Sequence, residues 1–286
     1  MTRGTPRRYR AAAGTARRQP RVRRASAGLS PTRAAAILTM LIAAGAVYGL
    51  VATPAFGLGR LDVTGASLTS EDAIRAKVGL DPGTNLVGLT TEPIAARLRE
   101  LPSIRDVEIA IGLPDVLQVA VTERRPIVVW AVGDRRFAID ETGLLFAEVT
   151  TDPSGATQGI PVVIDERASA SGLGVASTLD PVDLDAATRL GSLTPSQVGS
   201  HASAFRVRVT DDRGFTISSG SGGWVAVFGF YGRNQRTPAL IPGQVQLLGG
   251  LIAGREDTVL TVILADDREG TYIPKPTPRP SATPKP

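Results

Sequence analysis

The chain has 286 residues, enough for two compact domains. It contains no cysteine, which excludes disulfide bonds, a thiol nucleophile and a thiolate metal site. Its single histidine, His201, lies in the stretch VGSHASAF, where no spacing suits a metal site or a Ser–His relay. We therefore interpret His201 as an ordinary surface or loop residue and expect no metal and no cofactor.

Positive charge is concentrated at the N-terminus. Residues 1–33 carry ten arginines and no acidic residue. The net charge of the whole chain is +5, so the net charge of the rest of the chain is −5. A basic tail can bind nucleic acid, but this one has only Tyr9 for stacking on bases and no nucleic-acid-binding motif. We predict a disordered cytoplasmic tail over 1–33 and expect no nucleic-acid partner.

The segment 34–59 has no charged residue. At about 1.5 Å per residue, the most apolar part, residues 34–52, nearly spans a hydrocarbon core of about 30 Å. Residues 53–56 complete the span, so we predict a transmembrane helix over 34–56. Because the arginines precede it and only Arg60 follows closely, the positive-inside rule places the N-terminus in the cytoplasm and the bulk outside. A cleaved signal peptide is the alternative, but the long basic region and the lack of a clean A-x-A site favour an uncleaved anchor.

Residues 58–126 are predicted to form a small α+β domain. Alternating apolar residues indicate a strand at 59–65, and helix caps and apolar stripes indicate helices within 69–79 and 90–102. Period-two alternation over 103–125, with a turn in the middle, predicts two further strands. The expected order is strand, helix, helix, strand, strand.

Residues 127–270 are predicted to form a mostly β domain with one or two helices, which makes the exported part an α+β protein. Strands are expected within 127–149 and 205–229, and the last strand within 258–267 because β-branched residues are dense there. Helices are expected within 180–198 and 244–253, and a loop over 165–180. The proline-rich segment 271–286 is predicted to be a disordered tail.

Patterns that point to catalysis are weak. The glycine-rich stretch 218–224 lacks the lysine of a phosphate-binding loop and is interpreted as a hairpin turn. Asp140 and Glu141 are adjacent, as are Asp211 and Asp212, so each pair is more typical of a turn than of a shared acid–base site. We predict that the protein is not an enzyme.

Five features follow one another between residues 101 and 146. They are Leu101-Pro102, the turn proline Pro114, the strand end Glu123-Arg124-Arg125-Pro126, the apolar run with Trp130 and the turn Ile139-Asp140-Glu141-Thr142-Gly143. This order closely resembles the FtsQ/DivIB family of bacterial cell division proteins. Upstream, LDVTGASLTSEDAI resembles the opening of the family's POTRA domain.

The resemblance implies a non-catalytic scaffold of the divisome, anchored in the cytoplasmic membrane by a single span at the division septum. It implies binding to FtsB-like and FtsL-like proteins through the β domain, and through them an indirect link to the septal peptidoglycan synthase and regulation of septal peptidoglycan synthesis. In the family, the last strand and the segment after it resemble a docking edge. The matching positions here are Thr258, Val259, Leu260, Thr261, Val262, Ile263, Leu264 and Tyr272.

An alternative function is a POTRA-type envelope adaptor, or an accessory of a membrane-anchored cell-wall enzyme, that is not specific to division.

The residues Glu123, Arg124, Arg125 and Pro126 are interpreted as the joint between the two domains, because Pro126 cannot donate a ladder hydrogen bond. Arg124 and Arg125 are expected to orient that joint through surface ion pairs.

Overall fold

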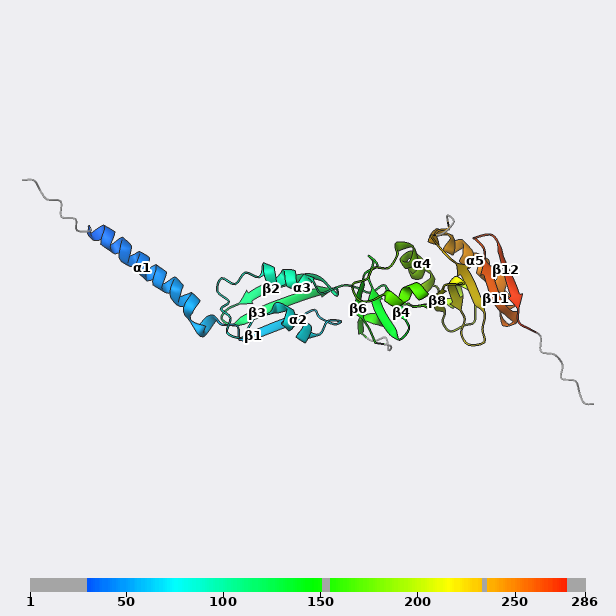
Figure 1. Cartoon of the computed structure of the whole chain (residues 1–286), viewed down its shortest axis with the longest axis horizontal. Coiled ribbons are helices and arrows are strands. Elements are labelled where there is room, and N and C mark those ends of the chain that lie inside the picture. The colour runs from blue at the N-terminus through cyan, green and yellow to red at the C-terminus, as the bar shows by residue number, and fades with distance from the viewer. Residues whose placement is uncertain (1–29, 151–154, 233–235, 277–286) are drawn as a thin grey trace, which may run out of the picture. The chain divides into compact units, whose positions relative to one another are not determined.

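The computed structural model describes residues 30–150, 155–232 and 236–276 (Figure 1). The chain divides into two units, residues 1–52 and 53–286. The first contains helix α1 (Pro31–Ala52), which is long and apolar enough to cross a membrane. The predicted tail lies outside the described residues except for its last four positions.

Helix α1 begins and ends earlier than the predicted span of 34–56. Ser30 accepts a hydrogen bond from the Arg33 N–H through its Oγ, at 3.4 Å, and Pro31 occupies the first helical position. At the other end Thr53 is extended, because the residue before a proline is disfavoured in the helical region. Pro54–Phe56 then forms the short 3-10 helix η1 instead of continuing the span.

The domain that follows has the predicted element order. Its sheet has the strand order β1-β3-β2 among the described residues, with β1 parallel and β2 antiparallel to β3. Helices α2 and α3 pack on one face over a core that includes Ile74, Leu98 and Leu117. The bounds are β1 (Arg60–Thr64), α2 (Glu71–Val78), α3 (Glu92–Arg99), β2 (Ile104–Gly112) and β3 (Val116–Glu123).

Local signals set the ends of these elements. The Ser70 Oγ accepts the Ala73 N–H, and Gly79 ends α2 with a φ of +60°, a left-handed conformation that favours glycine. The register of β2 shifts between Ile104 and Asp106, where the apolar alternation of the sequence slips. Thr91, the residue that precedes α3, makes no side-chain hydrogen bond to the start of that helix.

The second domain is built on one sheet, which has nine strands in the described residues. Their order is β12-β11-β10-β9-β8-β7-β4-β5-β6, and the pairs β4·β7, β7·β8 and β10·β11 are parallel. The strands are β4 (Val128–Val132), β5 (Arg135–Ile139), β6 (Leu145–Glu148), β7 (Val162–Asp165), β8 (Arg206–Thr210), β9 (Gly214–Ser218), β10 (Val225–Gly229), β11 (Val259–Leu264) and β12 (Gly270–Pro274).

Two helices cover one face of this sheet. Helix α4 packs against β4, β7 and β8, and α5 packs against β10, β11 and β12. Asp180 caps α4 by accepting the Val182 N–H at 2.8 Å, while α5 starts three residues earlier than expected, with Pro242 in its first turn. The helices are α4 (Pro181–Gly191) and α5 (Ile241–Ile252), with short 3-10 helices η2 (Gly155–Thr157), η3 (Ala168–Gly172), η4 (Pro195–Val198), η5 (Pro238–Leu240) and η6 (Glu256–Thr258).

The strand register sorts side chains between the two faces. One row, Val207, Ile217, Ala226 and Val262, is buried under the helices. The neighbouring row on the opposite face runs through Arg208, Thr216, Val227, Ile263 and Thr271. The core therefore lies on the helix side, and the other face of β8–β12 carries arginines, threonines and partly exposed aliphatic side chains.

Two strands lie where none was predicted. Strand β7 ends at Asp165, the first residue of the expected loop of 165–180, and pairs in parallel with β4 and β8. The strand β12 occupies positions 270–274, which were assigned to the junction of the β domain and a disordered tail. The prediction of a tail from 271 is wrong for 271–274, because these residues pair with β11; residues 277–286 lie outside the described part of the chain.

Candidate functional site at the sheet edge

The predicted docking strand is an internal strand of the sheet. Strand β11 pairs in parallel with β10 on one side and antiparallel with β12 on the other. Both sets of its backbone groups are therefore used within the sheet. The expectation that Thr258–Leu264 forms the last strand is wrong: Thr258 lies in η6, and the chain turns at 265–269 and returns as β12.

The edge of the sheet belongs to β12. It pairs only with β11 among the described residues, so its outer side presents backbone N–H and C=O groups that could accept a further strand. All five of its residues are exposed. Tyr272, predicted as a partner contact, is 38% exposed and Ile273 is 46% exposed. The Arg255 guanidinium lies 5.2 Å from the centroid of the Tyr272 ring and holds that side chain beside the edge.

The side chains of the predicted docking strand divide between core and surface. Val259, Val262 and Leu264 are buried, with Val262 at 0% exposure. Leu260 is 42% exposed and Ile263 is 40% exposed. The structure therefore brings Leu260, Ile263 and Tyr272 to the surface and removes the other three from any direct contact with a partner.

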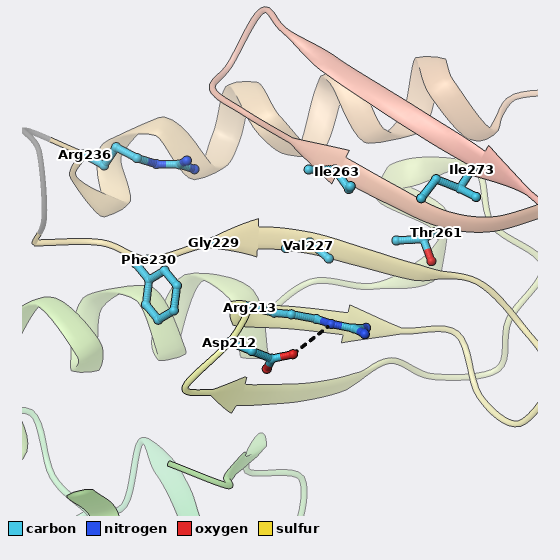
Figure 2. Close-up of a pocket in the computed structure, with 9 residues that line it drawn as sticks. All are labelled: Asp212, Arg213, Val227, Gly229, Phe230, Arg236, Thr261, Ile263 and Ile273. Carbon is cyan, nitrogen blue, oxygen red and sulfur yellow. Dashed lines mark ion pairs between the residues drawn. The ribbon is translucent and has the colours of Figure 1, made fainter. Parts of the chain in front are cut away.

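A groove lies on the helix-free face beside the edge (Figure 2). Its volume is about 610 Å³. The floor is apolar and comes from β10, β11 and β12 through Val227, Ile263 and Ile273. The other lining residues are polar, aromatic or glycine, namely Asp212, Arg213, Gly229, Phe230, Arg236 and Thr261. An apolar floor next to an edge strand suits the side chains of an added strand or of a segment leading into it.

The charged groups around the groove are tied to the sheet. Arg236 donates from Nη2 to the Phe228 carbonyl at 2.7 Å, while its Nε is buried with no hydrogen-bond partner. Arg213 lies 3.3 Å from the Asp212 carboxylate. The Thr210 hydroxyl donates to Asp212 at 2.6 Å and lowers the pKa of that carboxyl. The rim is thus polar and mixed in sign around an apolar floor.

Glu256 fixes the start of β11. Its carboxylate accepts hydrogen bonds from the Ser200 hydroxyl, from the His201 backbone N–H at 2.9 Å and from Trp224 Nε1 at 2.9 Å. Partial burial would raise the pKa of Glu256, but these hydrogen bonds outweigh it and lower the pKa to about 2. The Glu256 carboxylate thus ties the segment at 200–201 and Trp224 to η6, which leads directly into β11.

This cluster contains serine, histidine and glutamate but not the geometry of a hydrolase. Ser200 Oγ and His201 Nδ1 both contact the Glu256 carboxylate, so no described contact activates the serine through the histidine. The His201 side chain is 94% exposed, in agreement with the expectation of a surface residue. In the described ranges no group of three or more His, Asp or Glu residues could hold a metal ion.

Glu123, the first residue of the predicted joint, stabilises the domain of β1 to β3 from within. Its carboxylate accepts the backbone N–H groups of Ser67, Leu68 and Thr69 and the Ser67 hydroxyl, at 2.7 to 2.9 Å. Partial burial would raise the pKa of Glu123, but these hydrogen bonds hold it below its usual value. Glu123 thereby fixes the loop that leads into α2.

Arg124 connects the two domains. Its Nε donates to the Pro102 carbonyl at 2.9 Å, and its Nη1 lies 2.7 Å from Oδ2 of Asp140. The Asp140 side chain is 6% exposed, so this ion pair is partly buried, and the expectation of a surface pair is wrong for Arg124. Asp140 also accepts from Thr142, which confirms its turn position. Arg125 is exposed, and Pro126 lies between β3 and β4.

Comparison with known proteins places the first domain. Residues 56–124 match the family model of the POTRA domain, FtsQ-type. The match spans β1 to β3 and ends at Arg124, the residue that reaches across to the second domain.

Curated relatives extend the similarity beyond that domain. The chain is 30% identical over 190 residues to the cell division protein FtsQ of Streptomyces coelicolor, covering 65% of this chain and 70% of the relative. It is 24% identical over 246 residues to the cell division protein FtsQ of Chloroflexus aurantiacus, covering 86% and 80%. It is 28% identical over 190 residues to that of Mycobacteroides abscessus, covering 65% and 57%.

Proposed function

This chain belongs to the FtsQ/DivIB family of bacterial cell division proteins, and from that premise we propose that it is a non-catalytic, membrane-anchored scaffold of the divisome. Helix α1 is its single membrane span, with the basic tail in the cytoplasm and the POTRA and β domains outside. Its partners are an FtsB-like and an FtsL-like protein, through which it regulates septal peptidoglycan synthesis at the septum.

The observation that carries the docking proposal is the open outer side of β12. An extended partner segment would add to this edge as a tenth strand of the described sheet, since unpaired backbone groups give affinity without requiring a particular sequence. Specificity would come from Tyr272 and Ile273 on the edge and from Ile263 on the floor of the groove. The family resemblance implied 258–264 and the segment after it, with Tyr272; the proposed site is β12, which includes Tyr272, together with the exposed side chains of β11.

The docking proposal is tested by Ile273→Glu in the full chain reconstituted in nanodiscs. We expect the affinity for an FtsB-like and FtsL-like complex to fall at least about tenfold, because a charge replaces an apolar contact and about 1.4 kcal/mol corresponds to tenfold. The matched control is Val175→Glu, which places the same charge at a residue 41% exposed and outside the edge. Binding is measured by titration, and thermal unfolding verifies that both variants fold.

The proposal fails if Ile273→Glu binds as tightly as the unaltered chain, or if Val175→Glu weakens binding equally. The first result would remove the edge from the interface. The second would show that added negative charge, rather than its position, reduces affinity.

The septal location is tested separately with a fluorescent fusion expressed in dividing cells. We expect the label to concentrate at midcell, because the partners of a divisome scaffold assemble there. A fusion without residues 270–276, which removes β12 and keeps the core strand β11, serves as the comparison and is expected to lose midcell enrichment. Uniform membrane label from the intact chain would contradict the septal role.

A further inference from the structure

The hairpin between β2 and β3 ends in an exposed apolar tip that neither the core nor the docking edge uses. Leu113 is 59% exposed, more than any other large apolar side chain described outside α1, and Pro114 beside it is also exposed. The remaining residues of this kind are Val175, Leu260, Ile263, Tyr272 and Ile273. All but Val175 lie on β11 and β12, so Leu113 stands apart in both place and exposure.

This tip is held against the start of β1. The Asp115 carbonyl accepts the backbone N–H of Gly59 at 2.8 Å and that of Arg60 at 3.0 Å. A Cβ atom on Gly59 would lie 2.6 Å from Oδ2 of Asp115, so a larger residue there would require the contact to open. The hairpin tip therefore occupies the same end of the POTRA domain as the point where the chain enters it.

The chain enters the POTRA domain close behind α1. Only residues 53–58 separate the end of α1 from Gly59, and a fully extended chain of this length spans roughly 25 Å. The real reach is shorter, because Pro54–Phe56 is a 3-10 turn rising only about 2 Å per residue. The Leu58 N–H donates to the Thr84 carbonyl at 2.8 Å, so the linker is already part of the domain at that point.

We propose that Leu113 and Pro114 insert into the outer surface of the lipid bilayer and seat the POTRA domain on the membrane. The inference rests on the proposed role of α1 as a membrane span. A short linker confines the tip near the lipid headgroups, and an exposed leucine is stabilised by leaving water for the boundary of the acyl chains. Leu113 and Pro114 carry no charge; Asp115, the exposed third residue of the turn, has its carboxylate against Gly59.

The absence of cysteine from the sequence gives a direct test, because Leu113→Cys creates a single labelling site in the full chain. We expect an environment-sensitive fluorophore there to shift to the blue in vesicles of phosphatidylethanolamine and phosphatidylglycerol. Replacing these lipids by brominated ones is expected to quench it at least about twofold, since bromine quenches only on contact. The matched control, Val175→Cys, is expected to show neither effect.

The label must not cause the insertion that it reports. A second variant therefore carries the fluorophore at Pro114→Cys together with Leu113→Asp, and we expect it to lose the quenching that Pro114→Cys alone shows. Quenching that persists in the double variant would overturn the proposal, as would a label at position 113 that stays as exposed as the one at 175. A label that is shielded but unquenched would indicate a protein contact and would also overturn it.

Alkaline extraction of the vesicles separates this proposal from the anchor on which it rests. Release of the chain would contradict the membrane span itself. A chain that stays in the membrane while the label at 113 remains in water would leave the anchor intact and overturn the hairpin contact alone.

Discussion

Strands β11 and β12 are neighbours with opposite surroundings. The inner strand is paired on both sides, packed under α5 and fixed at its start by Glu256. Among the described residues the outer strand is paired on one side, and every one of its residues is exposed. Because side chains alternate along a strand, β11 carries both buried and exposed side chains: Val262 is buried and Ile263 is exposed. Stability and proposed docking thus depend on different side chains within a few residues.

Glutamate at these two adjacent positions gives the sharpest test of that division. We expect Val262→Glu to destabilise the β domain by more than about 4 kcal/mol, since a charge would enter a core that leaves it no partner. Ile263→Glu, its matched control, is expected to change the free energy of unfolding by less than about 1 kcal/mol. Urea unfolding of the full chain measures both. Similar losses in the two variants would contradict the separation of core and surface along β11.

A smaller effect is expected at the carboxylate that fixes the start of β11. Glu256→Gln should cost about 1 to 2 kcal/mol at neutral pH, because it removes a charged acceptor of several hydrogen bonds. The native pKa of Glu256, about 2, lies below the usual 4.5. Its contribution to stability is therefore complete above about pH 5 and is lost as the pH falls toward 2.

The unfolding midpoint measured from neutral pH down to about pH 2.5 tests this pH dependence. The Gln variant is expected to lose less stability than the unaltered chain over that range. Asp257→Asn, at an exposed neighbouring position, is the matched control and should keep the full pH dependence. Parallel curves for the unaltered chain and Glu256→Gln would show that Glu256 does not hold β11 through its charge.

The elements foreseen from sequence are those with local causes. Ser70 and Gly79 bound α2, and Asp180 begins α4, because capping groups act within a few residues. The two unforeseen strands depend on distant partners. In β12 only Thr271, Tyr272 and Ile273 lie between Gly270 and Pro274, and glycine and proline argue locally against a strand. Pairing with β11 outweighs that signal, and no pattern in the sequence reveals such a partner.

Distant partners, which leave no local signal in the sequence, also explain the wrong expectations about the sheet edge and about the joint. The family resemblance pointed to β11 and the segment after it as the docking edge, which stays a prediction, yet that β11 is an inner strand could not be inferred while β12 was unseen. At the joint, the sequence indicated that Arg124 forms an ion pair. Its partner Asp140 lies 16 residues away and is buried by the β domain, so only the fold shows that the pair is shielded from water.

The order of the strands sets the distance between the interdomain joint and the edge strand β12. Asp140, the contact of Arg124, directly follows β5, which lies seven strand intervals from β12. Neighbouring strands are about 4.8 Å apart, so roughly 34 Å of sheet separate the joint from the edge strand β12. Under the proposed docking, the β domain is a spacer of fixed width, with backbone hydrogen bonds across every interval. Removing or inserting a strand is then expected to change how far from the joint a partner is held, without altering either contact surface.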